Sequence, residues 1–474
     1  MFSRRNFNLK SVYEKIGLMR FLNKMNPITP MGIKFLKSLK FITDKVELEY
    51  ELNKIEVLKQ CIDKNYTFYQ RYLESFKDIF KTLISLSNGT ILDDIELFEI
   101  KIFSLDCQKI HNKIELPEFL KLEDLSGVIQ LLDPEKLNIR SFYIYDIYSE
   151  NLKNMRKRKK DLLNKDDKKE INSEELNKVA IEIEKEEMLI RKKLCSELKN
   201  FAKTLLDNFR KITELDFLIA KLDFVEKYNL KKPDLSKDTI EYKGFFNPLI
   251  KENLIYCGKE FQPVNILLKR GVTVITGANM SGKTVSLQSL ALSQCLLQLG
   301  FYVPAELGKM VLVDKIFLIS GDYQSQEQNL SSFAAEMLEI NSALQECRKR
   351  DKILILLDEP ANGTNPKEGT AIVKALIRCF VKMNSFVIIS THYDGITSEK
   401  NIRSYRVKGL VEETDDKISV NNIEEYIDYS LMEIKNEKTV PHEALRISKL
   451  LGIDEELIKI ANNILQTKET DYEQ

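Results

Sequence analysis

The fold of this chain is decided by the stretch Gly277-Ala278-Asn279-Met280-Ser281-Gly282-Lys283-Thr284. The stretch follows an apolar run at residues 272–275 and begins a long apolar-rich segment that ends near Leu299. A strand, a glycine loop and a helix in this order form a phosphate cradle, because the loop N–H groups turn inward and the helix N-terminus is positive. Lys283 can reach the outer phosphates, and the Thr284 hydroxyl is placed to ligate Mg²⁺. The sequence therefore predicts a site for a nucleoside triphosphate.

Composition narrows the class of protein. A length of 474 residues allows about two to four domains with a large core. The formal net charge is zero, which leaves nucleic-acid binding open because only local patches contact phosphates. The seven cysteines form no C-x-x-C pair, which argues against a zinc site or a disulfide framework and suits a reducing cytosol. We expect a soluble cytoplasmic protein, since no apolar run approaches a membrane span and residues 1–5 lack the apolar segment of a secretion signal.

The chain to about residue 240 is predicted to be mostly helical. Apolar residues recur at helical spacing over residues 39–55, and glycine is scarce in this part of the chain. Pro134 marks a break, because proline disfavours helix in the residue before it. The aromatic and β-branched residues 142–146 predict a short strand, and residues 212–228 predict an amphipathic helix.

A long, exposed helical hairpin is predicted over residues 149–199. This segment is mostly charged and polar, with apolar threads on both sides of a polar turn near residues 164–173. Its tightest basic cluster is Arg156, Lys157, Arg158, Lys159 and Lys160. Such a cluster is either the solvated face of a helix or a contact surface for nucleic-acid phosphates. The sequence leaves both interpretations open.

Two further apolar strands end in residues suited to phosphate chemistry. The run at residues 354–357 ends in Asp358 and Glu359, the pattern of a buried parallel strand. An aspartate there holds the Mg²⁺ shell, and the glutamate after it can orient and deprotonate the attacking water. The run at residues 386–390 delivers His392 to the edge where the carboxyl ends of parallel strands gather their ligand. We therefore expect His392 to contact the γ-phosphate or its water.

These stretches resemble the MutS family of DNA-repair ATPases. Residues 277–284, followed by 300–305, are similar to the family's first Walker motif and the segment after it. Leu357-Asp358-Glu359-Pro360 with residues 363–369 is similar to the second Walker motif and its adjoining dimer loop. Ser390-Thr391-His392-Tyr393 is similar to the histidine switch. Residues 319–322 and 325–337 resemble the signature loop that reaches the partner subunit's nucleotide. Within that loop, Gln328-Asn329-Leu330-Ser331-Ser332-Phe333 most resembles the branch that does not read mismatches. The resemblance is strongest from Phe261 to Tyr393.

The resemblance extends beyond this region. Thr29-Pro30-Met31-Gly32 resembles the opening of the MutS helical core, Ser149-Glu150-Asn151-Leu152 its second lever segment, and Ile212-Thr213-Glu214-Leu215-Asp216 the helix that closes the core. Residues 445–461 resemble the helix pair that helps MutS ATPases dimerise. Because the core motif begins by Thr29 and the chain ends soon after the helix pair, we expect no mismatch-reading domain and no nuclease-like domain.

The resemblance also implies roles for individual residues. ATP would be bound by Phe261, Gly277, Ala278, Asn279, Met280, Ser281, Gly282, Lys283 and Thr284. Phe261 occupies the position at which the family stacks an aromatic ring on adenine. Thr284 and Asp358 would hold Mg²⁺, and Glu359 would be the general base. Asn279 and His392 would sense the γ-phosphate and its water, and Ser331 would complete the partner's site in trans.

The expected fold class is an α/β P-loop NTPase domain of the ABC type, preceded by a mostly α-helical core and lever domain. The expected boundaries are residues 1–240 for the helical part with its hairpin near 149–200, residues 241–425 for the ATPase domain, and residues 426–474 for a helical dimerisation segment. The resemblance implies a Mg²⁺-dependent ATPase acting on duplex or branched DNA as a homodimer or MutS-like heterodimer, with no membrane partner. The alternative is an ATP-driven clamp on a protein client, which would reactivate an adenosylcobalamin-dependent aminomutase.

Overall fold

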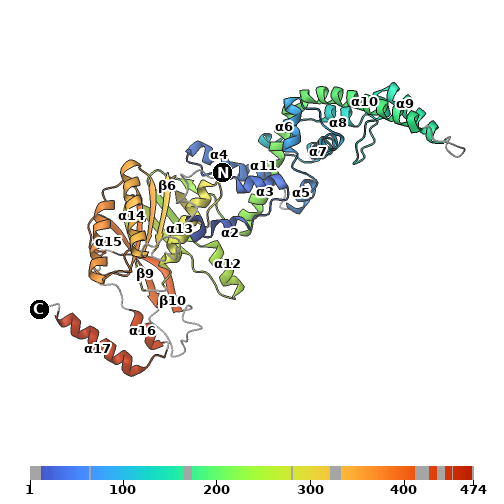
Figure 1. The fold of residues 1–474 in the computed structure, drawn as a ribbon. Coiled ribbons are helices and arrows are strands. Elements are labelled where there is room, and N and C mark those ends of the chain that lie inside the picture. The colour runs from blue at the N-terminus through green and yellow to red at the C-terminus, as the bar shows by residue number, and fades with distance from the viewer. Residues whose placement is uncertain are drawn as a thin grey trace. The chain divides into compact units, whose positions relative to one another are not determined.

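The computed structural model describes residues 12–62, 66–164, 173–278, 281–320, 332–410, 426–434, 443–450 and 452–471 (Figure 1). Packing divides the chain into two compact units. The helical unit comprises Met25–Leu39 and Asn53–Phe224, and the sheet unit comprises Met1–Lys24, Lys40–Leu52 and Val225–Gln474. The boundaries expected at residues 240 and 425 stay a prediction.

The helical unit contains long helices whose starts are encoded locally. Its helices are α3 (Pro30–Lys37), α5 (Tyr66–Leu73), α6 (Phe80–Asn88), α7 (Asp94–Lys113), α8 (Ser126–Leu132), α9 (Glu150–Asn164) and α10 (Ser173–Leu198), with short 3₁₀ turns η2 (Glu118–Leu120), η3 (Asp146–Tyr148) and η5 (Lys199–Phe201). Helices α4 (Lys45–Cys61) and α11 (Ala202–Lys227) each contribute residues to both units. At the start of α7, the Asp93 and Glu96 side chains form a capping box, which satisfies backbone N–H groups that the helix leaves unpaired.

The start of α3 is fastened to α11 by a buried carboxylate. Asp216 accepts hydrogen bonds from the Ile28 N–H at 2.9 Å, the Thr29 N–H at 2.8 Å and the Thr29 hydroxyl at 2.6 Å. The Thr29 hydroxyl oxygen in turn accepts from the Gly32 N–H at 2.9 Å and caps the helix. A Cβ atom at Gly32 would lie 2.1 Å from the Asp216 carboxylate, so a side chain there would push the two segments apart. These contacts give a physical reason for two sequence segments that resemble the MutS core.

The predicted hairpin forms from α9 and α10, but the predicted strand at residues 142–146 is wrong. Residues 142–145 belong to no strand or helix in the described chain, and η3 begins at Asp146. Ile144 instead joins the apolar core of the hairpin, which contains Leu152, Val179, Ile183, Ile190 and Leu194. The helical unit has no described strand with which residues 142–146 could pair. Their β propensity alone therefore does not produce a strand.

A lysine lies fully buried in the helical unit. The Lys101 ammonium donates to Asp133 Oδ1 at 3.0 Å, to the Ser141 carbonyl at 3.0 Å and to the Tyr145 hydroxyl at 2.9 Å, and neither charged side chain is exposed. Burial opposes ionisation of Asp133, but hydrogen bonds from the Asn138 N–H and Lys101 outweigh it and lower the pKa of the carboxyl. Lys101 thereby ties α7 to the segment that leads into the hairpin.

We expect Lys101→Met to destabilise the protein by about 3–5 kcal/mol, because it leaves the Asp133 carboxylate buried without its cation. Urea or thermal unfolding measures the loss. Lys109→Met is the matched control on α7, since the Lys109 side chain is 53% exposed and its partner Asp106 keeps a second cation, Arg140, at 2.8 Å. Its expected cost is below about 1 kcal/mol, and equal losses for the two variants would contradict the burial argument.

The sheet unit is organised around a six-stranded sheet with strand order β10-β9-β4-β8-β7-β6. The strands are β4 (Gly271–Thr276), β6 (Lys315–Ser320), β7 (Ile353–Asp358), β8 (Phe386–Thr391), β9 (Ile402–Leu410) and β10 (Ile427–Ile434). Only the pairing of β10 with β9 is antiparallel among these strands. The strands predicted before the glycine loop, at Asp358 and at His392 are confirmed as β4, β7 and β8. Their carboxyl ends therefore meet at one edge of the sheet.

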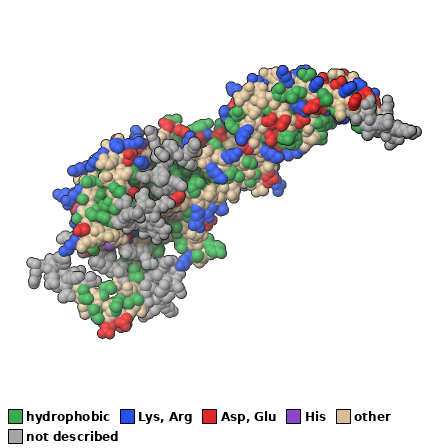
Figure 2. All heavy atoms as spheres, viewed as in Figure 1, with side chains coloured by type: hydrophobic (Ala, Val, Ile, Leu, Met, Phe, Trp, Pro, Cys, Tyr) green, Lys and Arg blue, Asp and Glu red, His purple; other side chains and the backbone are tan. Residues whose placement is uncertain are grey.

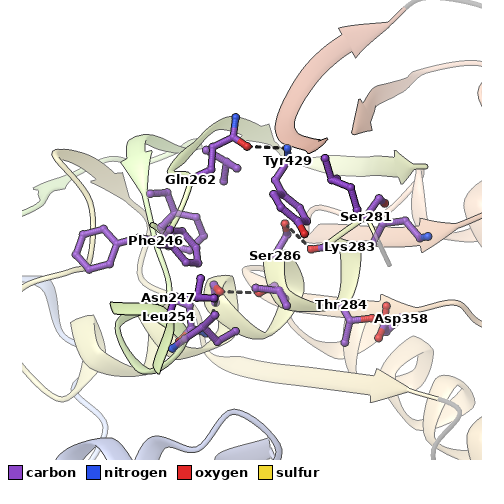
Figure 3. Close-up of a pocket in the computed structure, with 18 of the residues that line it drawn as sticks. Phe246, Asn247, Leu254, Gln262, Ser281, Lys283, Thr284, Ser286, Asp358 and Tyr429 are labelled. Carbon is purple, nitrogen blue, oxygen red and sulfur yellow. Dashed lines mark hydrogen bonds between the residues drawn. The ribbon is translucent and has the colours of Figure 1, made fainter. Parts of the chain in front are cut away.

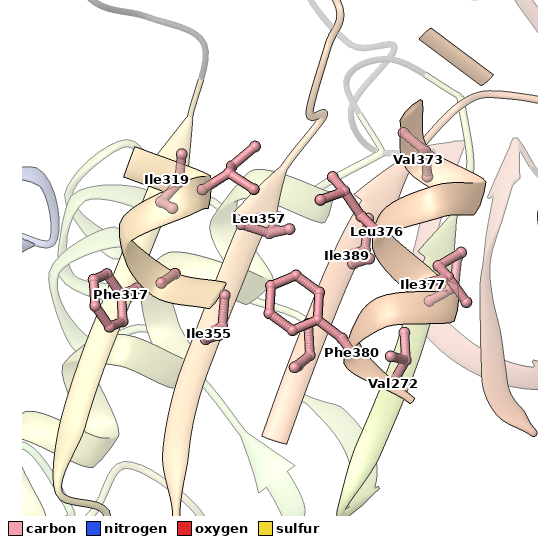
Figure 4. Packing of buried hydrophobic residues seen from close by; sticks show 14 of the residues in the cluster. Val272, Phe317, Ile319, Ile355, Leu357, Val373, Leu376, Ile377, Phe380 and Ile389 are labelled. Atoms are coloured by element: carbon pink, nitrogen blue, oxygen red, sulfur yellow. The ribbon is translucent and has the colours of Figure 1, made fainter. Parts of the chain in front are cut away.

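Helices α14 (Ser332–Lys349) and α15 (Pro366–Phe380) cover one face of this sheet (Figure 4). Figure 4 shows Phe380 of α15 between Ile355 of β7 and Val272 of β4, with Phe317 of β6 beyond Ile355. All four side chains are almost fully buried. This apolar layer fixes the strands whose ends carry the predicted site residues.

Helix α13 (Lys283–Gln298), which follows the glycine loop, lies between two sheets. It packs against β6, β7 and β8, and its Ser293 hydroxyl accepts a hydrogen bond from Tyr242 at 2.8 Å. Tyr242 belongs to a second sheet of order β1-β5-β2-β3, made of β1 (Asp234–Leu235), β2 (Thr239–Phe245), β3 (Val264–Lys269) and β5 (Leu307–Met310). The double cover explains why every residue of α13 from Ser289 to Gln298 is buried.

The remaining helices are short or lie near the end of the chain. They are α2 (Leu18–Leu22), α12 (Pro248–Tyr256), α16 (Glu443–Leu450) and α17 (Glu455–Asp471). Helices α16 and α17 correspond to the predicted helix pair, and α17 exposes Leu457, Ile460 and Ile464. Within the described ranges, no helix combines the length and the apolar character that a bilayer-spanning segment requires.

Candidate nucleotide site

A cavity of about 1120 Å³ lies beside the N-terminus of α13 in the sheet unit (Figure 3). Its walls come from the glycine loop, from α12 and the loop after it, and from the ends of β6 and β7 together with β10. The predicted site residues that line it are Phe261, Ser281, Gly282, Lys283, Thr284, Asp358 and Glu359. The volume is sufficient for a ligand of the size of a nucleoside triphosphate.

Lys283 holds the glycine loop from inside. Its ammonium donates to the Gly277 carbonyl at 2.8 Å and to the Ala278 carbonyl at 2.9 Å, and it lies 3.1 Å from Glu359 Oε1. The side chain is only 3% exposed, so its charge acts at short range with little screening by solvent. Gly282 precedes it in a left-handed conformation with φ of 86°, which glycine adopts without strain.

A serine hydroxyl connects the two acidic residues at the end of β7. Ser390 of β8 donates to Asp358 Oδ1 at 2.6 Å and accepts from the Glu359 N–H at 3.0 Å. Burial raises the pKa of Asp358, while hydrogen bonds from Ser390 and Thr284 oppose that rise. Figure 3 shows Thr284 and Asp358 directed toward each other at the cavity wall. The pair presents a hydroxyl and a carboxylate oxygen, the hard donors that Mg²⁺ prefers.

Glu359 lies between a lysine and a histidine. One carboxylate oxygen is 3.1 Å from the Lys283 ammonium, and the other accepts a hydrogen bond from Asn362 Nδ2 at 3.1 Å. His392 Nδ1 lies 3.5 Å from the latter oxygen, and this buried nitrogen has no hydrogen-bond partner in the described part of the chain. His392 does not line the cavity itself, so Glu359 separates it from the glycine loop. The Glu359 carboxylate therefore lies within reach of both an ammonium group and an imidazole ring.

Sequence reasoning missed Tyr429, which enters the cavity from β10. The Tyr429 N–H donates to Gln262 Oε1 at 2.8 Å, and Gln262 Nε2 donates to Asp428 Oδ1 at 2.7 Å. Burial disfavours ionisation of Asp428, but hydrogen bonds from Ser430, Gln262 and Lys408 outweigh it and hold the pKa of the carboxyl well below its usual range. The Gln262 amide thereby fastens β10 to the loop that carries Phe261. The sequence offered only a weak signal for Tyr429, since it is an aromatic residue in a short strand and belongs to no motif.

Comparison with known proteins bears on the same region. Residues 273–469 match MutS domain V. The chain is 34% identical over 218 residues to the Endonuclease MutS2 of Caldicellulosiruptor bescii, covering 44% of this chain and 26% of that protein. It is 30% identical over 305 residues to the Endonuclease MutS2 of Caldanaerobacter subterraneus, covering 63% of this chain and 36% of that protein. Residues 273–469 therefore form a domain of the MutS family. The resemblance predicted from the sequence is confirmed, and the names of these relatives are consistent with the mismatch-independent branch.

The chain matches only part of each relative. The aligned regions span 26% and 36% of the two proteins named above. MutS domain V is a P-loop ATPase domain, and its matched residues include the glycine loop from Gly277 together with Asp358, Glu359 and His392. Three predicted site residues, Asn279, Met280 and Ser331, lie outside the residues that the structure describes.

The basic cluster at residues 156–160 is partly neutralised within the hairpin. Arg156 donates to Asp146 at 2.5 Å and to Glu187 at 2.8 Å, and Arg158 pairs with Glu175 at 2.8 Å. Lys157, Lys159 and Lys160 also lie on α9, with Lys157 and Lys160 exposed. Figure 2 shows basic and acidic side chains interspersed over the helical unit on the face in view. The five cations lie on the same helix, but the two arginines have acidic partners of their own.

We expect Gly282→Ala to weaken binding of a fluorescent ATP analogue at least about tenfold, equivalent to 1.4 kcal/mol. The new Cβ atom would lie 3.1 Å from Tyr429 Cδ1 and would force alanine into φ of +86°. Gly258→Ala is the matched control, since Gly258 also lines the cavity at φ of +73° but has no heavy atom within 4 Å of the position that a Cβ atom would take. Both variants carry left-handed strain of about 1–2 kcal/mol. Equal affinities for the two variants would contradict a nucleotide site at Gly282.

Proposed function

We propose that this chain is a MutS-family, ATP-hydrolysing switch that acts on DNA as a dimer. The observation that carries the proposal is the convergence of Lys283, Thr284, Asp358 and Glu359 on one cavity of about 1120 Å³. MutS domain V accounts for ATP binding at the level of the family. Hydrolysis, its Mg²⁺ dependence, the individual residue roles and the dimer belong to the proposal.

In the proposed site, the chain positions ATP before it reacts. Lys283 exchanges its contacts with the Gly277 and Ala278 carbonyls for the outer phosphates, aided by the loop N–H groups and the N-terminus of α13. Phe261 and Tyr429 line the cavity and offer aromatic surfaces to the adenine. The insertion of β8 between β4 and β7 supports the ABC-type assignment of the domain, because it brings Ser390 and His392 beside Asp358 and Glu359.

The oxygen donors of Thr284 and Asp358 suit Mg²⁺, which would neutralise charge on the β- and γ-phosphates. Glu359 is the proposed general base, and its carboxylate takes the proton of the attacking water. His392 and Asn279 would hold that water or the γ-phosphate, and Ser331 would reach the nucleotide of the partner subunit. Such a composite site couples ATP binding to association of the two ATPase domains.

DNA is the proposed substrate because both named relatives are called Endonuclease MutS2. Recognition would use the sugar–phosphate backbone of duplex or branched DNA, since phosphate contacts position a protein without reading bases. Within the basic cluster, Lys157, Lys159 and Lys160 are the better candidates for phosphate contact. The two arginines of the cluster already have carboxylate partners.

A protein client is the second candidate, and the surface of the hairpin favours it. Helix α10 exposes Ile181 by 52%, Met188 by 52% and Leu189 by 63%. Exposed apolar residues on a helix that also carries acidic side chains suit a protein surface better than a polyanion. The client class raised by the family resemblance is an adenosylcobalamin-dependent aminomutase.

We expect Glu359→Gln to bind ATP with nearly unchanged affinity and to hydrolyse it at least about a hundredfold more slowly, because an amide cannot act as the base. Steady-state phosphate release measures hydrolysis, and equilibrium binding of a fluorescent analogue measures affinity. Glu184→Gln is the matched control, since Glu184 is exposed on α10 and does not line the cavity. Hydrolysis at the wild-type rate in Glu359→Gln would contradict the assignment of Glu359 as the general base.

We expect the triple variant Lys157→Gln, Lys159→Gln and Lys160→Gln to weaken binding of branched duplex DNA and to reduce its salt dependence. The slope of log K against log salt should become shallower by about 0.9 for each phosphate interaction that the variant removes. The control triple Lys178→Gln, Lys185→Gln and Lys192→Gln removes the same charge from exposed positions of α10. Absence of DNA binding at low salt would reject DNA and favour the protein client, whose ATP-driven release of damaged cofactor is the matching assay.

A further inference from the structure

The turn that follows Glu359 is held at one residue from two sides. The Ala361 N–H donates to Glu336 Oε2 at 3.3 Å, and the Tyr393 hydroxyl donates to the Ala361 carbonyl oxygen at 2.9 Å. Ala361 is fully buried, and Tyr393 and Glu336 are 8% and 2% exposed. Glu336 comes from α14 and Tyr393 follows β8, so two separate elements hold the backbone of a single residue.

The backbone of this turn needs such support. Glu359 has φ of 47° and Ala361 has φ of 62°, a left-handed region that residues with a Cβ atom occupy at a cost. The turn is closed internally by weak hydrogen bonds, from the Asn362 N–H to the Glu359 carbonyl at 3.3 Å and from the Thr364 N–H to the Ala361 carbonyl at 3.4 Å. Strained backbone persists where the surrounding structure over-determines it.

A glycine on α15, Gly369, leaves space for the Tyr393 hydroxyl. A Cβ atom at Gly369 of α15 would lie 2.4 Å from the Tyr393 hydroxyl oxygen and 3.2 Å from the Ala361 carbonyl oxygen. Only a residue without a side chain leaves room at this position for the hydrogen bond. Three elements, α14, α15 and the end of β8, therefore meet at Ala361.

Glu336 is an acidic residue in an apolar surrounding. It sits one helical turn into α14, and Ile340 on the next turn belongs to the sheet core. Burial raises the pKa of Glu336, and the Ala361 N–H opposes that rise. Its second oxygen, Oε1, is buried without a hydrogen-bond partner among the described residues. Burial of a carboxyl group costs folding free energy. An apolar side chain at position 336 would avoid that cost but could not accept the hydrogen bond from the Ala361 N–H.

We infer that Glu336 and Tyr393 are positioning residues, which hold the 359–362 turn and so fix the Glu359 carboxylate between Lys283 and His392. Tyr393 follows His392 directly, so the turn and the histidine are set by neighbouring residues of one segment. Glu336 acts through the backbone of Ala361 and does not line the cavity. The catalytic consequence rests on the proposed ATP hydrolysis, whereas the holding of the turn does not.

The test compares Glu336→Ala, Glu336→Gln (E336Q) and Tyr393→Phe with the wild-type chain. Glu336→Ala and Tyr393→Phe each remove one hold on Ala361, whereas E336Q keeps a side-chain carbonyl oxygen that can accept from the Ala361 N–H. Leu338→Ala is the matched control, because Leu338 lies on the same helix with 57% exposure. Two quantities are measured on each full-length variant: hydrogen exchange of the backbone amides in residues 359–364, and kcat and KM for ATP.

We expect faster exchange in residues 359–364 for Glu336→Ala and Tyr393→Phe, with E336Q and Leu338→Ala close to the wild type. We also expect kcat to fall between about tenfold and a hundredfold with little change in KM, since a misplaced base affects the chemical step and not binding. E336Q should restore most of kcat, which a loss caused by general unfolding would not allow.

The outcomes separate this inference from the proposed function. Exchange and kcat at wild-type levels in both Glu336→Ala and Tyr393→Phe would overturn the inference while leaving ATP hydrolysis intact. A wild-type chain without ATPase activity would reject the proposed hydrolysis, and the exchange measurement would still decide whether Glu336 holds the turn. A uniform rise in exchange across the sheet unit would overturn a local positioning role as well.

Discussion

The parallel register of β4, β8 and β7 is the constraint on which the nucleotide site depends. The register pairs Thr276 with Thr391, and Asp358 with both Ser390 and Ser320. Strands from distant parts of the sequence therefore end at the same level of the sheet. A slip of one residue would turn Ser390 to the opposite face of the sheet and break its bridge between Asp358 and Glu359. The apolar layer beneath α14 and α15 resists such a slip, because it fixes each strand by packing. The chemistry of the site is therefore set by burial in the core as much as by the residues of the loop.

Sequence reasoning succeeded where a signal was local. The glycine loop, the run ending in Asp358 and the run ending before His392 each carry their strand or helix neighbour within a few residues, and β4, β7 and β8 are confirmed. It failed at residues 142–146, where β propensity had no strand to pair with in the helical unit. It also missed Tyr429, Lys101 and Glu336. Their significance lies in partners far along the chain, such as Gln262, Asp133 and Ala361, which no local pattern encodes.

The hairpin illustrates the difference between a charge in a sequence and a charge on a surface. In the sequence, residues 156–160 form an unbroken basic run. In the folded hairpin, Arg156 and Arg158 are committed to carboxylates of η3 and α10, so the remaining positive charge of the cluster rests on its lysines. The alternation of basic and acidic side chains over this unit in Figure 2 lowers the field that a polyanion would meet. A partner must therefore recognise a mixed surface, whichever class of macromolecule it belongs to.

The burial of α13 between two sheets has a mechanical consequence. The helix has 16 residues and is about 24 Å long. Its buried residues are mostly apolar, and they include the side-chain amides of Gln294 and Gln298. At its far end, the Gln298 backbone carbonyl accepts from the Ile42 N–H at 2.7 Å, in the segment that leads into α4. Protein interiors compress little, so a shift imposed at the phosphate end has no soft layer in which to dissipate. The packing of α13 therefore joins Gly282 of the glycine loop mechanically to the residues that precede α4.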